Sequence, residues 1–429
     1  MSTLAVDLTE VTEALGRLDI WIEQEQFRGW DPHDALNSPL LQRISGHNRL
    51  MGIALVQLLR RTPVNLRPLL RVRKGINPKA MGLFLTSSAL KFISTREEAN
   101  LRQVRFFWNW LIENATQGYA GPCWGYNFDW PNRGFFAPAG TPTIVNTAFI
   151  ALSFLDAEPV LTETSRFSAP AGEEKIQTGR RTASESNMDA LSIARGACEF
   201  VLSNLSVLRP SVNELCFSYT PLDRRFVHNA NLLGAWLLAA VYHRTGESRL
   251  AESAIAASKF TVSRQSPDGS WPYGIARCDK WVDNFHTGYV LVSLKRIGRY
   301  LQTDEFDIAT CRGYEYWKER MLLSHSIPKY YPDRVFPIDI HCVAQAILTF
   351  IEFSDIDPSA MNQAVRLSRW AIENLQDPKG FFHYQIQRWH RVRIPYIRWG
   401  QAWMQLALTK LVYGSSTGLC SDLALAARC

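Results

Sequence analysis

The feature that most constrains the fold is a helix-forming segment that recurs at a nearly constant spacing. Five such segments share one organisation, in which a polar or aromatic loop leads into a nearly apolar helix. Aligning Asn231, His286, His341 and Gln401 as equivalent positions gives steps of 55, 55 and 60 residues. A repeat of this length is typical of stacked helical hairpins, because each hairpin buries its apolar face only against its neighbours.

Helical periodicity along the chain predicts twelve helices that form six consecutive pairs. They cover 46–60, 77–94, 98–116, 142–156, 188–205, 226–243, 247–264, 283–299, 304–322, 338–354, 359–375 and 397–413. The second helix of each pair is nearly apolar on all sides, whereas the first carries more charge, so the second helices are expected inside. Few segments alternate with a period of two, which argues against a β-rich fold. The prediction is an all-α chain, an (α/α)6 toroid with inner and outer rings.

The toroid is predicted to span 46–415 as one domain. Residues 1–45 are predicted to form an N-terminal helix and a capping loop, which lies over the core or contributes to the site as a lid. The segment 158–187 is rich in Ser, Thr, Glu and Pro, which predicts a flexible insertion. Residues 416–429 are expected to form a C-terminal tail.

The charge balance is mildly basic, with 47 Lys and Arg against 40 Asp and Glu. The basic residues are dispersed, which favours a solvated surface over a nucleic-acid site. Attraction to an anionic substrate, or peripheral contact with a membrane surface, remains open. The oligomeric state is not constrained.

Eight cysteines show no CxxC pairing and no regular disulfide spacing. In a chain of this length that pattern is typical of reduced thiols, so we expect a cytoplasmic location. The N-terminus lacks the basic and apolar regions of a signal peptide, and no apolar run reaches 18 residues, so no transmembrane segment is expected.

Two turns share a Gln, a Gly and an aromatic residue at one spacing: Gln265, Gly269, Trp271 and Gln376, Gly380, Phe382. This pattern resembles the Gln-Trp repeat of the squalene-cyclase and protein-prenyltransferase toroids. The resemblance implies the toroid fold, a mainly structural role for these turns, and an isoprenoid substrate as one alternative.

The following segment, 274–286, is similar to the one through which prenyltransferase β subunits supply an Asp and a Cys to zinc. Asp283 matches the Asp, but Phe285 stands in place of the Cys, and the chain contains no DxDD acid motif of the cyclases. The segments WDPHDALNSPL and NLRPLLRVRKGINPKAMGLFL resemble uncharacterised bacterial proteins of exopolysaccharide clusters.

In a toroid the N-termini of the inner helices meet at one end, together with the loops before them. The residues expected there combine flat rings with hydrogen-bonding groups, as a sugar requires. The predicted substrate-binding residues are Trp124, Asn127, Asp129, Asn146, His228, Asn229, Asn284, Tyr384, Arg398 and Trp399. Capping of helix ends is the competing explanation for Asn284, and for Asp283 and Asp339 among the catalytic candidates below.

Six residues are candidates for catalysis. They are Asp283, Asp339, His286, His341, Tyr126 and Tyr273. Two carboxylates on adjacent inner helices would divide the acid and base roles of a glycosidase. Alternatively a histidine carries the proton near neutral pH, or a tyrosine serves as acid or base in a lyase or epimerase.

No cofactor is expected, although Asp283, His286 and His341 form an alternative zinc triad. The sequence contains no GxSxG elbow and no phosphate-binding glycine loop. The leading prediction is an enzyme that processes an anionic oligo- or polysaccharide intermediate by hydrolysis, elimination or epimerisation. An isoprenoid-processing toroid and a non-catalytic glycan-binding scaffold are the alternatives.

Overall fold

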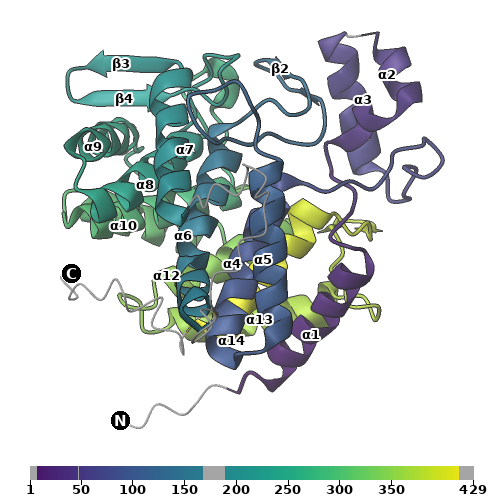
Figure 1. The fold of residues 1–429 in the computed structure, drawn as a ribbon. Helices are drawn as coiled ribbons and strands as arrows, with labels where there is room; N and C mark the ends of the chain where they lie inside the picture. The colour runs from purple at the N-terminus through teal and green to yellow at the C-terminus, as the bar shows by residue number, and fades with distance from the viewer. Residues whose placement is uncertain (1–6, 47, 168–188, 415–429) are drawn as a thin grey trace, which may run out of the picture.

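The computed structural model describes residues 7–46, 48–167 and 189–414 and confirms the predicted all-α toroid (Figure 1). Its inner helices are α4 (Pro78–Thr95), α6 (Ile144–Phe167), α8 (His228–Thr245), α10 (Asn284–Leu301), α12 (Ile340–Glu352) and α14 (Ala402–Tyr413). Each inner helix packs against the next, and α14 packs against α4, so the inner ring closes on itself.

The outer helices are α5 (Glu98–Glu113), α7 (Ala190–Asn204), α9 (Ser248–Val262), α11 (Asp307–Arg320), α13 (Ala360–Leu375) and α1 (Thr9–Gln24). Most of them pack chiefly on the inner helix that precedes them in the chain. The hairpins therefore run from inner to outer helix, opposite to the predicted pairing. Short turns join the two helices in four hairpins, α4–α5, α8–α9, α10–α11 and α12–α13, and the long aromatic loops lie between hairpins.

The helix α1 completes the outer ring, although residues 1–45 were expected outside the toroid. Its apolar stripe, which includes Leu15, Leu18 and Ile22, is fully buried, and the helix packs against α13 and α14. In a closed ring the last inner helix, α14, also needs an outer helix packed over it. The N-terminal helix provides that cover.

The two glutamine turns, at Gln265 and Gln376, make equivalent hydrogen bonds to the next outer helix. Gln265 Nε2 donates to the carbonyls of Gly269 and Ala309 on α11, and Arg312 donates to Gln265 Oε1. In the second turn Gln376 Nε2 donates to Gly380 and to Ala14 on α1, and Arg17 donates to Gln376 Oε1. Each glutamine thus ties one outer helix to the next, so α1 occupies the position that α11 occupies elsewhere in the ring.

The segment 46–60, predicted to start the toroid, lies outside both rings. It forms α3 (Arg49–Arg61), which packs with α2 (Pro39–Ser45) and the 3₁₀ turn η1 (Asp34–Asn37) beside the toroid (Figure 1). Val56 and Leu59 of α3 enter a second, small core with Ala35, Leu41 and Val72. The segment is an amphipathic helix as predicted, but its apolar face packs within this separate group of η1, α2 and α3, which we call the α2–α3 unit.

The helix α6 extends to Phe167, so residues 158–167 are helical rather than part of the predicted flexible insertion. The rest of that prediction, and the predicted tail, lie outside the described residues. By length and composition Ile144–Glu163 passes a test for a membrane-spanning helix, but 72% of the window is buried inside the molecule. Its apolar character is explained by its position between α4 and α8.

The strands are short and belong to the inter-hairpin loops. Two hairpins pair β1 (Trp130–Pro131) with β2 (Phe136–Ala137) and β3 (Val207–Ser211) with β4 (Glu214–Phe217). A three-stranded ribbon contains β5 (Ile338–Asp339), β6 (Gln385–Ile386) and β7 (Arg391–Val392), with Asp339 opposite Gln385. The remaining turns are η2 (Arg277–Asp279), η3 (Ser324–Ser326) and the π-helical turn η4 (Ile397–Gln401) before α14.

Candidate active site

The N-termini of the inner helices border a cavity of about 730 Å³. The second residue of every inner helix, counting η4 as the start of α14, lines it: Lys79, Val145, Asn229, Phe285, His341 and Arg398. The walls are completed by residues from the inter-hairpin loops and from α3. The ring thus brings one residue from each of the six repeats, which are far apart in sequence, to the same cavity.

Asp283 and His286 form a hydrogen-bonded pair at this cavity. Asp283 Oδ1 accepts from the backbone N–H of His286, so the side chain caps α10. Its Oδ2 lies 2.7 Å from His286 Nδ1 and accepts from Trp281 Nε1 at 3.0 Å. A carboxylate can only accept, so Nδ1 carries the proton and the lone pair belongs to Nε2. Because His286 is partly exposed whereas Asp283 is buried, the imidazole is the group presented to a ligand.

His341 is held in the same tautomer, between a backbone carbonyl and a tyrosine. Its Nδ1 lies 3.0 Å from the carbonyl oxygen of Trp399, so this nitrogen donates, and Nε2 accepts from the Tyr289 hydroxyl at 2.6 Å. Burial, followed by the nearby charge of Lys79, lowers the pKa of His341 well below its usual value. The ring is therefore neutral near pH 7. The ring centroids of Tyr289 and His286 are 6.3 Å apart, so both groups border the same space.

Cationic side chains outnumber acidic ones in the lining of the cavity. The Lys and Arg side chains that line it are Arg60, Arg61, Lys79, Arg133, Arg225, Arg334 and Arg398. The acids in the described lining are Asp283, which pairs with His286, and Asp333, which is exposed and pairs with Arg334. Positive charge inside a partly desolvated cavity favours an anionic ligand.

Two of these cations are fixed by their surroundings. Arg398 donates through Nε and Nη2 to the carboxylate of Asp31, at 2.6 and 2.8 Å. Lys79 is nearly fully buried, with Nζ 4.3 Å from the ring centroid of Phe149 and 5.5 Å from that of Tyr289. Burial, then the charge of Arg398, lowers the pKa of Lys79 well below its usual value.

Aromatic rings form much of the remaining wall. Tyr273 stacks on Trp281 with 4.6 Å between ring centroids, and Tyr126 stacks on Phe128 at 5.1 Å. Burial raises the pKa of both tyrosines, so their phenols stay protonated. Flat faces with fixed hydroxyls suit a ligand that has apolar ring faces and polar edges.

Half of the predicted site residues border this cavity: Asp283, His286, His341, Tyr126, Tyr273, Asn229, Arg398 and Trp399. Asp339 does not. It is fully buried as the cap of α12, where it accepts from the His341 N–H, Trp399 Nε1 and Gln385 Nε2. The expected pair of opposed carboxylates is therefore not formed at the cavity, because the second carboxylate positions Trp399.

The other predicted residues have structural partners elsewhere. The Asn284 side chain donates to the Met321 carbonyl and accepts from Trp317 Nε1. Asn127 Oδ1 accepts from the Asn77 side chain, and Asp129 Oδ1 accepts from the backbone N–H of Ala139. The Tyr384 hydroxyl accepts from Arg60 behind the wall, at 2.6 Å.

His228 points outward to α9, where its Nδ1 lies 3.4 Å from Thr261 Oγ1 and burial lowers its pKa to about 3. Asn146 is buried with no partner for its side-chain amide among the described residues.

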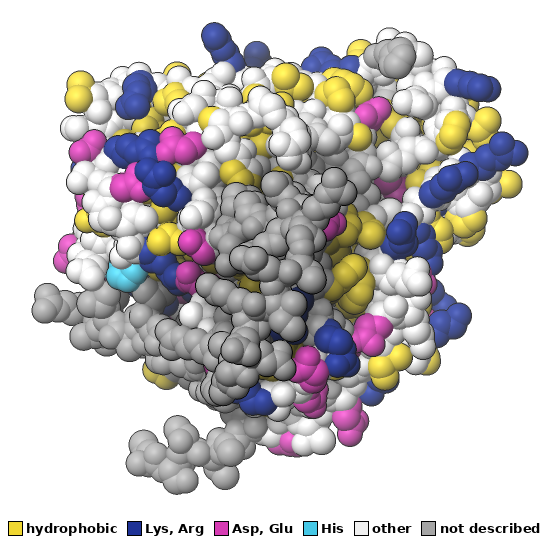
Figure 2. Space-filling model, viewed as in Figure 1, with side chains coloured by type: hydrophobic (Ala, Val, Ile, Leu, Met, Phe, Trp, Pro, Cys, Tyr) yellow, Lys and Arg dark blue, Asp and Glu magenta, His cyan; other side chains and the backbone are white. Residues whose placement is uncertain are grey.

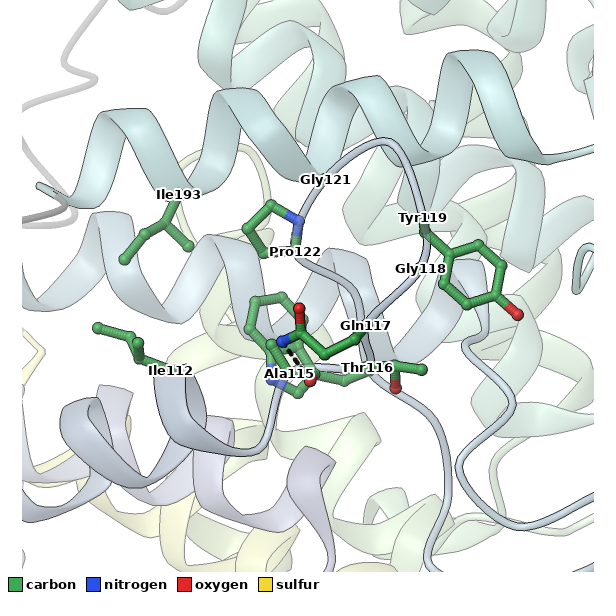
Figure 3. A pocket seen from close by; sticks show the side chains of 10 residues that line it. Ile112, Ala115, Thr116, Gln117, Gly118, Tyr119, Gly121, Pro122 and Ile193 are labelled. Atoms are coloured by element: carbon green, nitrogen blue, oxygen red, sulfur yellow. Dashed lines mark hydrogen bonds between the residues drawn. The ribbon is translucent and has the colours of Figure 1, made fainter. Parts of the chain in front are cut away.

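Trp124 lines a separate, smaller cavity of about 260 Å³. Figure 3 shows this cavity between the turn from Ala115 to Pro122 and Ile193 of α7. The indole Nε1 of Trp124 donates to the Leu111 carbonyl at 2.8 Å, which holds the ring against the end of α5. The described lining of this cavity contains no carboxylate, imidazole or cationic group, so the chemistry belongs to the larger cavity.

The alternative zinc triad is not assembled. Among the described residues no three His, Cys, Asp or Glu side chains gather closely enough to hold a metal ion. His286 Nδ1 is engaged by Asp283, and both ring nitrogens of His341 are engaged by Trp399 and Tyr289. His286 and His341 are also not equivalent, because His286 is the third residue of its helix and Phe285 is the counterpart of His341.

Sequence analysis missed Lys79, Tyr289, Arg60 and Arg225. A usable signal existed for Lys79: Asn77 caps α4 and accepts from the Lys79 N–H, as Asp339 accepts from the His341 N–H. Comparing the second residue of each apolar helix would have placed Lys79 at the cavity. Arg60 had no such signal, because α3 is outside the repeat.

No protein-family model matches this chain, and no curated protein matches its sequence. Solved structures do match its fold. A cellobiose 2-epimerase from Bacillus thermoamylovorans B4167 has a TM-score of 0.59 at 9% identity, over 80% of this chain and 90% of its own.

A family 76 glycoside hydrolase from a bovine Bacteroides thetaiotaomicron strain has a TM-score of 0.61 at 9% identity, over 95% and 78% of the two chains. An unsaturated glucuronyl hydrolase from Streptococcus agalactiae has a TM-score of 0.55 at 13% identity, over 95% and 93%. At these identities the likeness establishes the architecture alone: the chain is an (α/α)6 toroid of the kind found in these sugar-processing proteins.

Proposed function

We propose that the protein is an enzyme that transfers a proton at a carbon next to a carbonyl group of an anionic saccharide, and so epimerises or isomerises a sugar. The observation that carries the proposal is the Asp283–His286 pair, whose imidazole faces a basic, tyrosine-lined cavity. Solved toroids of similar fold include a cellobiose 2-epimerase, which supports this class of reaction.

In the proposed step His286 Nε2 removes the proton from the carbon beside the carbonyl. The bonding electrons move to the carbonyl oxygen and form an enediolate, which the cavity cations stabilise. A proton returned to the opposite face of the same carbon gives the epimer, and one returned to the former carbonyl carbon gives the isomeric ketose. The Tyr289–His341 pair is the second proton carrier in reach of this space.

Asp283 acts through His286. By accepting from Nδ1–H it holds the tautomer whose Nε2 lone pair is free, and it stabilises the imidazolium that forms. The reaction needs no cofactor, because side chains supply both proton transfers.

We also propose a cytoplasmic location, in line with the free thiols of Cys123, Cys198, Cys216 and Cys342.

The test is deuterium incorporation. The protein would be incubated in D₂O with a panel of uronic acids, phosphorylated sugars and neutral disaccharides, and each sugar followed by NMR. Deuterium at the carbon next to the carbonyl, together with a new epimer or ketose, is the expected result. Cleavage of a glycosidic bond without exchange would instead assign the site to hydrolysis.

Elimination from a uronic acid residue is the second candidate, since the same cations and phenols would stabilise an enolised carboxylate and its leaving group. Elimination creates a new carbon–carbon double bond, and the ultraviolet absorbance of that bond distinguishes it from epimerisation.

The basic lining counts against an isoprenoid substrate, whose chain would leave the cavity cations desolvated and unpaired. A glycan-binding scaffold would bind a saccharide from the panel and catalyse no exchange, elimination or cleavage.

A further inference from the structure

The α2–α3 unit carries an unusual density of exposed apolar side chains. Of the sixteen large hydrophobic residues that are exposed in the described structure, seven lie within its helices and the loop that follows. They are Leu40, Ile44, Leu50, Met51, Leu58, Val64 and Leu69. Exposed apolar residues scattered singly need no explanation, but a concentration of this kind marks an interaction surface.

The three of these residues that belong to α3, Leu50, Met51 and Leu58, share one side of the helix. Leu50 and Leu58 are 70% and 65% exposed and stand two helical turns apart on the same stripe. On other sides of the helix, Val56 and Leu59 fill the small core and Arg60 reaches the cavity. The buried contacts of the helix are thus accounted for, and the outward stripe has no structural partner among the described residues.

The charge of the same region has one sign. From Ala35 to Arg96 the sequence contains eleven Lys and Arg and no Asp or Glu over 62 residues. Arg43, Arg49, Arg61, Arg71 and Arg73 are exposed. Among the described residues no ion pair joins these five to an acid, whereas the exposed Arg195 and Arg249 on the outer helices are each paired with a glutamate. Figure 2 shows yellow and dark blue side chains together over this unit, at the upper right.

We propose that this face, the α2–α3 face, binds the surface of an anionic phospholipid bilayer. Its leucine and isoleucine side chains would enter the boundary between headgroups and acyl chains, and its arginines would meet lipid phosphates. A symmetric contact with a second copy would place arginines against arginines with no acid to pair them. A nucleic acid would leave the apolar stripe in water. The combination of an apolar stripe and unpaired cations is satisfied by anionic lipid.

This inference does not depend on the proposed reaction. It does have a consequence for it, because α3 borders the cavity on one side and presents the lipid-binding face on the other. Docking would hold the cavity next to the headgroups, so a saccharide carried on a lipid anchor would reach His286 without leaving the membrane surface.

The experiment is co-sedimentation of the full chain with vesicles of phosphatidylcholine alone or mixed with phosphatidylglycerol. We expect binding to the anionic vesicles that weakens as salt is added. The double variants Leu50→Gln/Leu58→Gln and Arg43→Gln/Arg49→Gln should each lower the partition coefficient about tenfold. The matched control is Val212→Gln/Ile308→Gln, which removes two apolar side chains that are 94% and 84% exposed elsewhere.

Equal binding to both kinds of vesicle, or unchanged binding by Leu50→Gln/Leu58→Gln, would overturn the proposal. Self-association without vesicles that the same variants abolish would assign the face to a second copy. Binding of RNA without binding of vesicles would assign it to nucleic acid. All changed side chains are exposed, and thermal unfolding of each variant verifies that it is folded.

Discussion

Asp283 illustrates how one side chain at the start of an inner helix serves both fold and site. One carboxylate oxygen caps α10, and the other fixes the His286 tautomer and accepts from Trp281. Asp339 has the same position on α12, but its carboxylate faces Gln385 and Trp399 and is closed off from the cavity. Equivalent positions in the repeat therefore carry different functions, which depend on the loop packed over each cap.

The first prediction concerns this pair. His286→Gln should lower turnover and deuterium exchange about 10²- to 10⁴-fold, because the variant lacks the base. Asp283→Asn should lose much of the same activity, because an amide N–H beside Nδ1 favours the tautomer whose Nε2 is protonated. The variants are compared by single-turnover exchange in D₂O. The exposed His390→Gln is the control, and full activity in either Asp283→Asn or His286→Gln would contradict the assignment.

The second prediction concerns stability at low pH. His228 is buried and neutral, and burial lowers its pKa from 6.5 to about 3, so below pH 6.5 the unfolded chain binds a proton that the folded chain resists. Stability from this group is complete above pH 6.5 and is lost as pH falls toward 3. His228→Gln should flatten that dependence by about 3 kcal/mol in urea unfolding between pH 7 and pH 4. An unchanged slope, with His390→Gln as reference, would contradict it.

At the scale of elements, closure of the ring decides the role of each helix. The helix α1 is first in sequence and yet covers the last inner helix, through a glutamine turn that repeats the one at α11. The two turns also share a glycine with positive φ, Gly269 at +93° and Gly380 at +102°, where an added Cβ would meet the backbone of the neighbouring outer helix. The turns are thus clamps between successive hairpins.

The third prediction follows from these clamps. Gln265→Ala and Gln376→Ala each remove an amide that donates two hydrogen bonds and accepts from an arginine, so each should cost about 1–3 kcal/mol of unfolding free energy. Urea denaturation measures both. Equal losses are expected from the two variants, since α1 and α11 are equivalent. A loss confined to Gln265→Ala would mean that α1 is not a required part of the ring.

At the scale of the molecule, the distribution of charge is more informative than its sum. The chain has a formal net charge of +7, but seven Lys and Arg converge on one cavity, and the acid-free stretch from Ala35 to Arg96 contains both α2 and α3. Field lines concentrate in a cavity of this kind, which raises the local concentration of anions.

The fourth prediction uses that field. For the proposed anionic saccharide, KM should rise about three- to tenfold as ionic strength increases from near zero to several hundred millimolar, because salt screens the cavity charges. A neutral saccharide with the same reacting end should show little change and serves as the control. Steady-state kinetics over a salt series provides the measurement, and parallel behaviour of the two substrates would show that charge does not select the ligand.

The sequence alone was sufficient for the fold class, an all-α toroid, and for its inner ring of helices. Apolar periodicity depends only on local order along the chain, and it identified the inner helices, the glutamine turns and the loops that precede the inner N-termini. Local caps could also be recognised, so Asp283 and Asp339 were placed correctly at helix starts.

Only the tertiary structure decided which of these residues meet. Whether a cap faces the cavity or a neighbouring loop depends on contacts between distant parts of the sequence. Gln385 and Asp339 are 46 positions apart, and Arg398 and Asp31 are 367 positions apart. The place of α1 in the ring, and of α3 outside it, depends on closure, which amphipathicity cannot report because both helices have an apolar face to bury. The same long-range packing places His286 at the cavity and turns His228 away from it, toward α9.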